Sequence, residues 1–174
     1  WGNPLKSYLI FAGIILVGLF FKRIVSRLLG KLLFKLFKKF ATESHSDTFI
    51  AILIKPFEFF ILIAIFFIAT KQLQHPLDVK ILDYTVKQGN IKVLEPFTIG
   101  NLLDKIYLFL VIWSVFWIFL RIVDFVAFVF LQRAQRTENR ADDQLVPFLK
   151  ELLKFIIYFI GFFVLLGYVF EVNA

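Results

Sequence analysis

The stretch Phe59–Ala69, FFILIAIFFIA, places an apolar side chain in every direction around a helix. A helix that is apolar on all sides either contacts lipid or is buried among other helices. The stretch ends a longer, mostly apolar segment, Phe49–Ala69, which matches the roughly 20 residues that a helix needs to cross a bilayer. It therefore predicts a membrane-spanning helix and sets the class of the protein.

The composition of the whole chain agrees with this class. Hydrophobic residues make up 60% of the 174 residues, and Phe alone supplies 25, whereas a soluble domain is about half apolar. The net charge is +7, from 20 basic and 13 acidic side chains. Because the basic residues flank the apolar spans, we expect anionic lipid headgroups as their partner and no nucleic acid.

Three further segments are long and apolar enough to cross a membrane: Leu5–Val25, Leu102–Leu131 and Phe148–Phe170. Together with Phe49–Ala69 they predict an all-α integral membrane protein with four transmembrane helices. The first of these helices is expected to continue beyond the membrane as a basic amphipathic extension.

The charges of the connecting segments set the orientation. Segment 22–48 holds seven basic residues and segment 132–150 holds four, whereas segment 70–105 holds five, nearly balanced by four acidic residues. Loops rich in Lys and Arg stay in the cytoplasm, so both ends of the chain are expected outside. The predicted parts are 1–48 (first outer helix with its cytoplasmic extension), 49–69 (second outer helix), 70–101 (periplasmic loop) and 102–174 (a helix pair with a cytoplasmic turn at 132–147).

The extension reads KRIVSRLLGKLLFKLFKKF, residues 22–40, and its basic residues recur every four positions. This spacing stacks them on one face of a helix, with Leu and Phe side chains on the other side. Such a cationic amphipathic helix can lie along lipid headgroups. A voltage sensor is disfavoured because its Arg residues would lie within a span. The residues predicted to contact headgroups are Arg23, Arg27, Lys31, Lys35, Lys38 and Lys39.

The loop between the second and third spans contains TVKQGNIKVLEP, residues 85–96. Gly89 and Asn90 form a turn signal between β-branched residues. A small hairpin and a plain loop are both compatible with this pattern.

The third span carries a charged pair, Arg121 and Asp124, three residues apart. Arg121 lies about 28 Å along the helix from Leu102, at 1.5 Å per residue, which is near the inner headgroups. We therefore expect an interfacial ion pair. Trp113 and Trp117 share a face of the same span too deep for an interfacial belt, so we place them against a neighbouring helix.

Asp142 and Asp143 precede the fourth span and raise the question of a metal site. The sequence DDQLV lacks the last acid of a DDxxD motif, and no second acidic cluster lies on the same side. Asp side chains favour the positive end of a helix dipole, and Pro147 fits in or near a first turn. The pair is interpreted as a helix start.

Other chemistry finds no support in the sequence. Cysteine is absent, and His45 and His75 are predicted on opposite sides of the membrane without ligand spacing around either. No Ser has a nucleophile motif and no Gly-rich phosphate loop occurs. We therefore expect no metal, no cofactor and no enzymatic activity.

The stretch DDQLVPFLKELLKFIIYFIGFFVLLGYVFEVNA, residues 142–174, resembles the helix before the pore in the small-conductance mechanosensitive channel (MscS) family. The shared pattern is a charged cytoplasmic turn, a Leu-Val-Pro entry, a Lys in the first turn and a long aliphatic helix. Gly167 and the FEVNA step stand where family members have a Gly and a hydrophobic-Asn step outside. Residues 1–101 match only in topology.

The resemblance implies that residues 102–131 and 148–170 are the first two core helices, and that residues 5–69 are an additional outer pair. It implies a homo-oligomer, a heptamer, in the bacterial inner membrane. The family releases ions and small solutes under osmotic downshock. The pore helix and the soluble cytoplasmic domain are absent from residues 1–174 and are expected after Ala174.

A second interpretation is a non-channel, four-helix membrane scaffold or accessory subunit of a larger complex. The four predicted spans contain no polar stripe that could line a pore, and Thr70 and Ser114 are among their few polar uncharged residues. The spans alone do not separate the two interpretations.

Overall fold

A computed structural model describes residues 2–38, 45–88, 91–134 and 140–169; for residues 84–88, 91–95 and 140–143 it describes only the backbone. The described residues form four helices and one β-hairpin. The helices are α1 (Leu5–Phe37), α2 (Ser46–Thr70), α3 (Ile99–Ala134) and α4 (Arg140–Tyr168), and the strands are β1 (Lys80–Gln88) and β2 (Ile91–Thr98).

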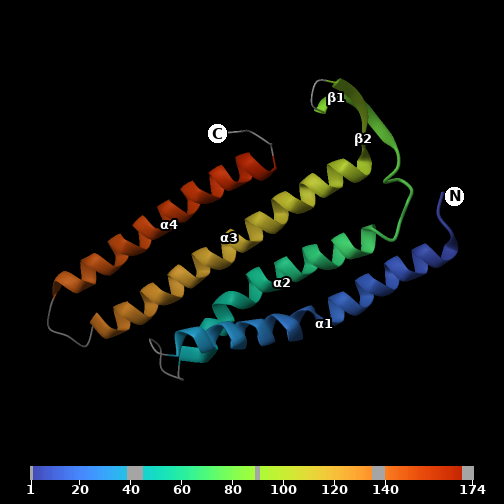
Figure 1. Ribbon diagram of the computed structural model, residues 1–174. Helices are drawn as coiled ribbons and strands as arrows, with labels where there is room; N and C mark the ends of the chain where they lie inside the picture. Colours follow the sequence, from blue (N-terminus) through green and yellow to red (C-terminus); the bar gives the residue numbers. More distant parts are fainter. Residues whose placement is uncertain (1, 39–44, 89–90, 135–139, 170–174) are drawn as a thin grey trace.

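The four helices lie side by side in chain order, as Figure 1 shows, with α1 and α4 at the two edges of the row. Each helix packs mainly on its neighbours in the chain: α1 on α2, α2 on α3, and α3 on α4. Consecutive helices run in opposite directions. The hairpin, the start of α1 and the end of α4 therefore share one end of the molecule, which we call the hairpin end; the other is the opposite end.

Three helices within the described residues, α1, α2 and α3, are long and apolar enough to cross a membrane. This is the character of a multi-pass membrane protein, as predicted. The spans predicted at 5–25, 49–69 and 102–131 lie inside these helices, and the helices extend beyond them. In particular, α1 continues without interruption from its span through the basic extension to Phe37.

The buried core lies at the opposite end, away from the hairpin. It joins α1, α2 and α3 through an aromatic and aliphatic cluster. Phe49 and Phe125 stand at its centre, with ring centroids 4.6 Å apart in an edge-to-face arrangement. The buried members of the cluster are Phe34, Phe49, Leu53, Phe57, Phe125 and Val129.

The membrane-length segments of α1 and α3 are far less covered: only 6% of the most apolar window of each is buried inside the chain. Lipid tails are as apolar as the side chains, so no hydrophobic effect drives these segments together. The distribution of burial along the helices is therefore the one expected for helices whose middle parts lie in lipid.

The loop between α2 and α3 contains an antiparallel hairpin, which decides between the two structures that its sequence allowed. The pairing runs from Gln88↔Ile91 to Lys80↔Thr98, with an irregularity between Lys80 and Leu82. The turn signal Gly89-Asn90 lies outside the described residues. The prediction of an all-α architecture is confirmed, and the hairpin is its one β element within the described residues.

α4 begins at Arg140, close to the helix start that the sequence placed at Asp142 and Asp143. The turn expected at 132–147 is shorter, since α4 already passes through Pro147. Proline removes one backbone hydrogen bond but fits the helical φ angle. A helix can continue through a proline when the residues on both sides keep their helical hydrogen bonds. α2 does the same at Pro56.

Candidate functional site

The basic residues of α1 gather on one exposed face, as their spacing predicted. Arg23, Arg27, Lys31 and Lys35 are all exposed, and Lys38, directly after the helix, is exposed as well. Lys39 lies outside the described residues. The exposed side chains of Arg23, Arg27, Lys31 and Lys35 can therefore meet a charged surface.

The rest of the extension has two apolar faces instead of one. Ser26, Gly30 and Phe34 are buried, on the side that packs against α2. Beside the basic face, a second stripe remains exposed: Leu28, Leu32 and Leu36 are 54%, 57% and 71% exposed. An exposed apolar stripe next to a basic one suits a membrane interface, where acyl chains meet the Leu side chains and phosphates meet the cations.

Ser26 shows how the extension keeps its polar groups satisfied. Its hydroxyl is fully buried and donates a 2.7 Å hydrogen bond to the carbonyl of Lys22, one turn earlier. This bond within the helix removes the cost of an unpaired hydroxyl against α2. The helix can therefore place a small polar residue at its contact with α2.

Arg121 and Asp124 lie together on α3, 3.3 Å apart between the guanidinium nitrogen Nη1 and Oδ2. The other oxygen of Asp124 contacts two lysines of α4: Lys154 Nζ at 2.7 Å and Lys150 Nζ at 3.1 Å. We call these four residues the Asp124 cluster. It has three cations around one carboxylate, so two positive charges remain in excess.

Sequence reasoning missed the two lysines of this cluster. It paired Arg121 with Asp124 because they are three residues apart on one helix, and it examined no pair between helices. A usable signal was present: Lys150 and Lys154 are four residues apart, on one face of a helix that runs antiparallel to α3. A carboxylate on the facing side of α3 was therefore their natural partner.

Asp142 and Asp143 lie in the first turn of α4, where the backbone is helical. Their side chains lie outside what the structure describes. Among the described residues, no group of three or more His, Asp or Glu side chains lies together as a metal ion would require.

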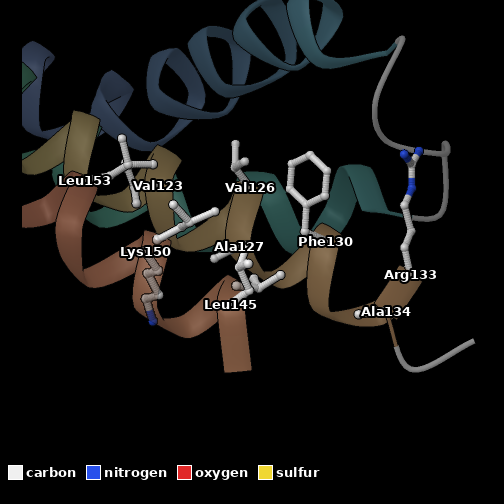
Figure 2. Close-up of a pocket in the computed structure, with 11 residues that line it drawn as sticks. Val123, Val126, Ala127, Phe130, Arg133, Ala134, Leu145, Lys150 and Leu153 are labelled. Carbon is white, nitrogen blue, oxygen red and sulfur yellow. The ribbon is translucent and has the colours of Figure 1, made fainter. Parts of the chain in front are cut away.

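Two hollows open along the contact between α3 and α4. The first, which we call the Phe130 groove, has a volume of about 460 Å³ and lies near the opposite end. Figure 2 shows Arg133 at one end of it and Lys150 at another side, with apolar side chains between them. These apolar residues include Val123, Val126, Ala127, Phe130, Leu145 and Leu153.

The second hollow, the Trp117 groove, lies farther toward the hairpin end and has a volume of about 560 Å³. Trp113, Phe116 and Trp117 line it from α3, and Ile157, Tyr158 and Phe162 line it from α4. Trp117 also packs edge-to-face on Phe59 of α2, at 5.7 Å between ring centroids. It therefore lies against a neighbouring helix as expected.

Trp113 does not follow this expectation. Its side chain stacks on Phe109 of its own helix and is 53% exposed. The sequence showed that the two Trp residues share a face but not that the face lies beside an open groove.

Comparison with known proteins finds no matching family model, no matching curated protein and no matching solved structure. The relation to mechanosensitive channels therefore rests on the sequence pattern alone.

Proposed function

We propose that this chain is the membrane-embedded, tension-sensing region of a mechanosensitive channel in a bacterial inner membrane. In this proposal α4 is a fourth crossing, the hairpin end faces the periplasm and the opposite end faces the cytoplasm. The observation that carries the proposal is the arrangement of the helices as an open row with most of its membrane-length apolar surface uncovered.

An open row differs from a closed bundle in how it responds to tension. Lateral tension favours whichever state of a protein occupies the larger area in the membrane plane, because that state has the lower free energy under tension. Between the hairpin end and the buried cluster, the helices of this row are little covered by one another. Small changes in tilt or spacing of these parts therefore change the area of the row with little loss of internal packing.

The fourth crossing is supported by the composition of α4. From Phe155 to Tyr168 it carries no charged side chain. Large apolar side chains on several sides of it are exposed within the chain, among them Phe155, Phe159 and Phe162. An uncovered apolar surface on this uncharged part of α4 is stable in lipid, and in water it would need a partner.

The Asp124 cluster supports a mechanical link between α3 and α4. Its two ion pairs across the helices, at 2.7 and 3.1 Å, hold the two helices together near the opposite end. Tilt of the row would then reach α4 through α3. By the resemblance, α4 would pass this movement to a pore helix in a heptamer, through which ions and small solutes leave the cell.

The test is patch recording of the full-length protein in liposomes under suction. We expect a stretch-activated conductance that is absent from protein-free liposomes. A folded oligomer that gives no such current up to the tension at which patches rupture contradicts the channel and favours a membrane scaffold. Asp124→Ala, which removes both links to α4, is expected to raise the tension needed for opening. Asp83→Ala, which breaks an ion pair within the hairpin, is the control and should leave that tension unchanged.

A further inference from the structure

We propose that the Trp117 groove and the Asp124 cluster together form a binding site for one anionic phospholipid. Its acyl chain would occupy the groove, and its phosphate would contact Arg121, Lys150 and Lys154. The inference rests on the proposed function only in that α4 must lie in the bilayer beside α3; it does not require tension sensing.

The groove has the shape and chemistry of a surface for an acyl chain. Its lining is almost wholly apolar and strongly aromatic, and it opens sideways, because Trp113, Tyr158 and Phe162 are each more than half exposed. From Trp113 to Leu120 it extends along α3 for about 10 Å, at 1.5 Å per residue. A hollow that opens to the bilayer is filled by lipid, since an empty apolar void loses packing contacts.

The cluster supplies the complementary charge. Asp124 occupies both of its oxygens with the three cations, yet each ammonium group has three donors and a guanidinium has five. Donors therefore remain for a phosphate. The Lys150 and Lys154 side chains are only 31% and 20% exposed, so their charges are partly removed from water and act more strongly on an anion.

The Trp117 groove and the Asp124 cluster follow one another along the helices, as the acyl chain and the phosphate do in a phospholipid. Asp124 lies one turn beyond Leu120, the last groove residue on α3, and Lys154 lies one turn before Tyr158 on α4. The cluster thus lies one turn beyond the end of the groove, where the uncharged run Ile106–Leu120 stops. A lipid of the leaflet at the opposite end has its phosphate at that level and its chains directed toward the bilayer centre.

The Phe130 groove is not the acyl site of this lipid. It lies on the far side of the cluster from the uncharged run, so a chain placed there would point out of the bilayer. The excess of two positive charges favours a headgroup with net negative charge over a zwitterionic one, which is the reason for proposing an anionic lipid.

Tryptophan fluorescence tests the proposal directly, since the chain has only three Trp residues and two of them line the groove. The protein with Trp1→Phe is reconstituted into vesicles that contain phosphatidylglycerol or phosphatidylcholine brominated on the acyl chain. Bromine quenches a Trp that it contacts. We expect brominated phosphatidylglycerol to quench Trp113 and Trp117 at lower mole fraction than brominated phosphatidylcholine.

Charge variants locate the headgroup. Lys150→Gln and Lys154→Gln should each reduce the preference for phosphatidylglycerol by about fivefold, the effect of one basic group near an anionic lipid. Lys→Arg at both positions should keep the preference, and Asp124→Asn should increase it. Lys6→Gln with Lys80→Gln, both at the hairpin end, is the control and should leave it unchanged.

The outcomes separate the lipid site from the proposed crossing of α4. In protein whose three Trp residues are replaced by Phe, Phe162→Trp reports on α4 alone. If this Trp is quenched by both lipids but the double Lys→Gln variant keeps the full phosphatidylglycerol preference, the lipid site is wrong and the crossing stands. If neither lipid quenches the Trp at position 162, both the crossing and the site are wrong.

Discussion

At the scale of single residues, stability is concentrated in the aromatic cluster at the opposite end. Phe125 of α3 is 1% exposed and makes edge contacts with three Phe rings, those of Phe34, Phe37 and Phe49. Because this one side chain touches both α1 and α2, its removal leaves a cavity between three helices.

Phe125→Ala is expected to lower the free energy of unfolding by about 3–5 kcal/mol, the usual cost of deleting a buried Phe. Phe119→Ala, on the same helix, removes a side chain that is 51% exposed and should cost far less. Unfolding in mixed micelles, followed by circular dichroism, gives the comparison. Equal losses for the two variants would show that the cluster is not the centre of stability.

Asn3 provides a second residue-scale contact, between the start of the chain and the end of α2. Its Oδ1 accepts hydrogen bonds from the backbone N–H groups of Gln74 and His75, at 2.7 and 3.0 Å, and its Nδ2 donates to the carbonyl of His75. The side chain itself is buried. It therefore ties the start of the chain to the loop that follows α2.

Asn3→Ala should destabilise the protein by about 1–3 kcal/mol, because it removes three hydrogen bonds that each contribute about 0.5–1.5 kcal/mol. Asn3→Asp keeps the acceptor oxygens and should lose less, which makes it the matched control. Thermal unfolding of both variants beside the wild type measures the difference. An alanine variant as stable as the wild type would show that the hydrogen bonds of Asn3 do not stabilise the protein.

The exposed basic residues could be predicted from the sequence, because a repeat of four gives one helical face wherever that helix packs. The exposed Leu28, Leu32 and Leu36 could not. Periodicity separates polar from apolar faces, but it does not tell which apolar residues a neighbouring helix covers. The lysine partners of Asp124 were missed for the related reason that they belong to another helix.

At the scale of elements, the contact between α1 and α2 depends on a close approach at Gly18. A Cβ atom at this position would lie 2.6 Å from side-chain atoms of Ile65, whereas a Cβ at Gly13 meets nothing within 4 Å. Small residues of this kind allow membrane helices to approach closely and gain packing contacts.

Gly18→Leu should therefore push α1 away from α2 and destabilise the pair by about 1–3 kcal/mol, as overpacking usually does. Gly13→Leu introduces the same side chain on the same helix into open space and should be nearly neutral. Spin labels at Leu16 and Phe67, both exposed, would report a longer distance only in the Gly18 variant. An unchanged distance there would show that α1 does not depend on this contact.

The existence and order of three membrane-length helices could be read from length and apolarity. Their ends could not, since apolarity marks the part of a helix that suits lipid, whereas the helix stops where its backbone bonding ends. Thus α3 begins at Ile99 and ends at Ala134, beyond both ends of the predicted span 102–131. The sequence placed Pro147 in or near the first turn of the fourth helix, whereas α4 begins seven residues earlier. The hairpin remained undecided because its turn signal suits a loop equally well.

At the scale of the whole molecule, the proposed topology has four crossings, with both ends of the chain outside. The charge bias of the connecting segments predicts which end of each helix faces the cytoplasm. If α4 crosses the membrane, its two ends lie on opposite sides of it. The arrangement as an open row was not predictable, because it depends on which faces pair and not on how apolar each helix is.

Single cysteines can test this topology cleanly, since the chain has none of its own. With a membrane-impermeant maleimide, Asp83→Cys in the hairpin and Tyr168→Cys at the end of α4 should be labelled in intact cells. Lys38→Cys and Gln144→Cys should be labelled only after permeabilisation. Labelling at positions 144 and 168 from the same side would contradict a crossing by α4.

The buried cluster joins three of the helices and leaves out the fourth, and this divides the molecule into parts of unequal local stability. Among the described residues of α4, only Gly161 is buried, and the helix is held mainly by its contact with α3. Local opening of a protein starts where few apolar contacts must break. Backbone amides of α4 at 145–154 should therefore exchange with deuterium well before those of α2 at 49–57, as mass spectrometry of peptides would measure. If α4 exchanges as slowly as α2, both helices open in one cooperative step. If α4 exchanges first, as expected, it is the helix that detaches from the other three at the lowest free energy.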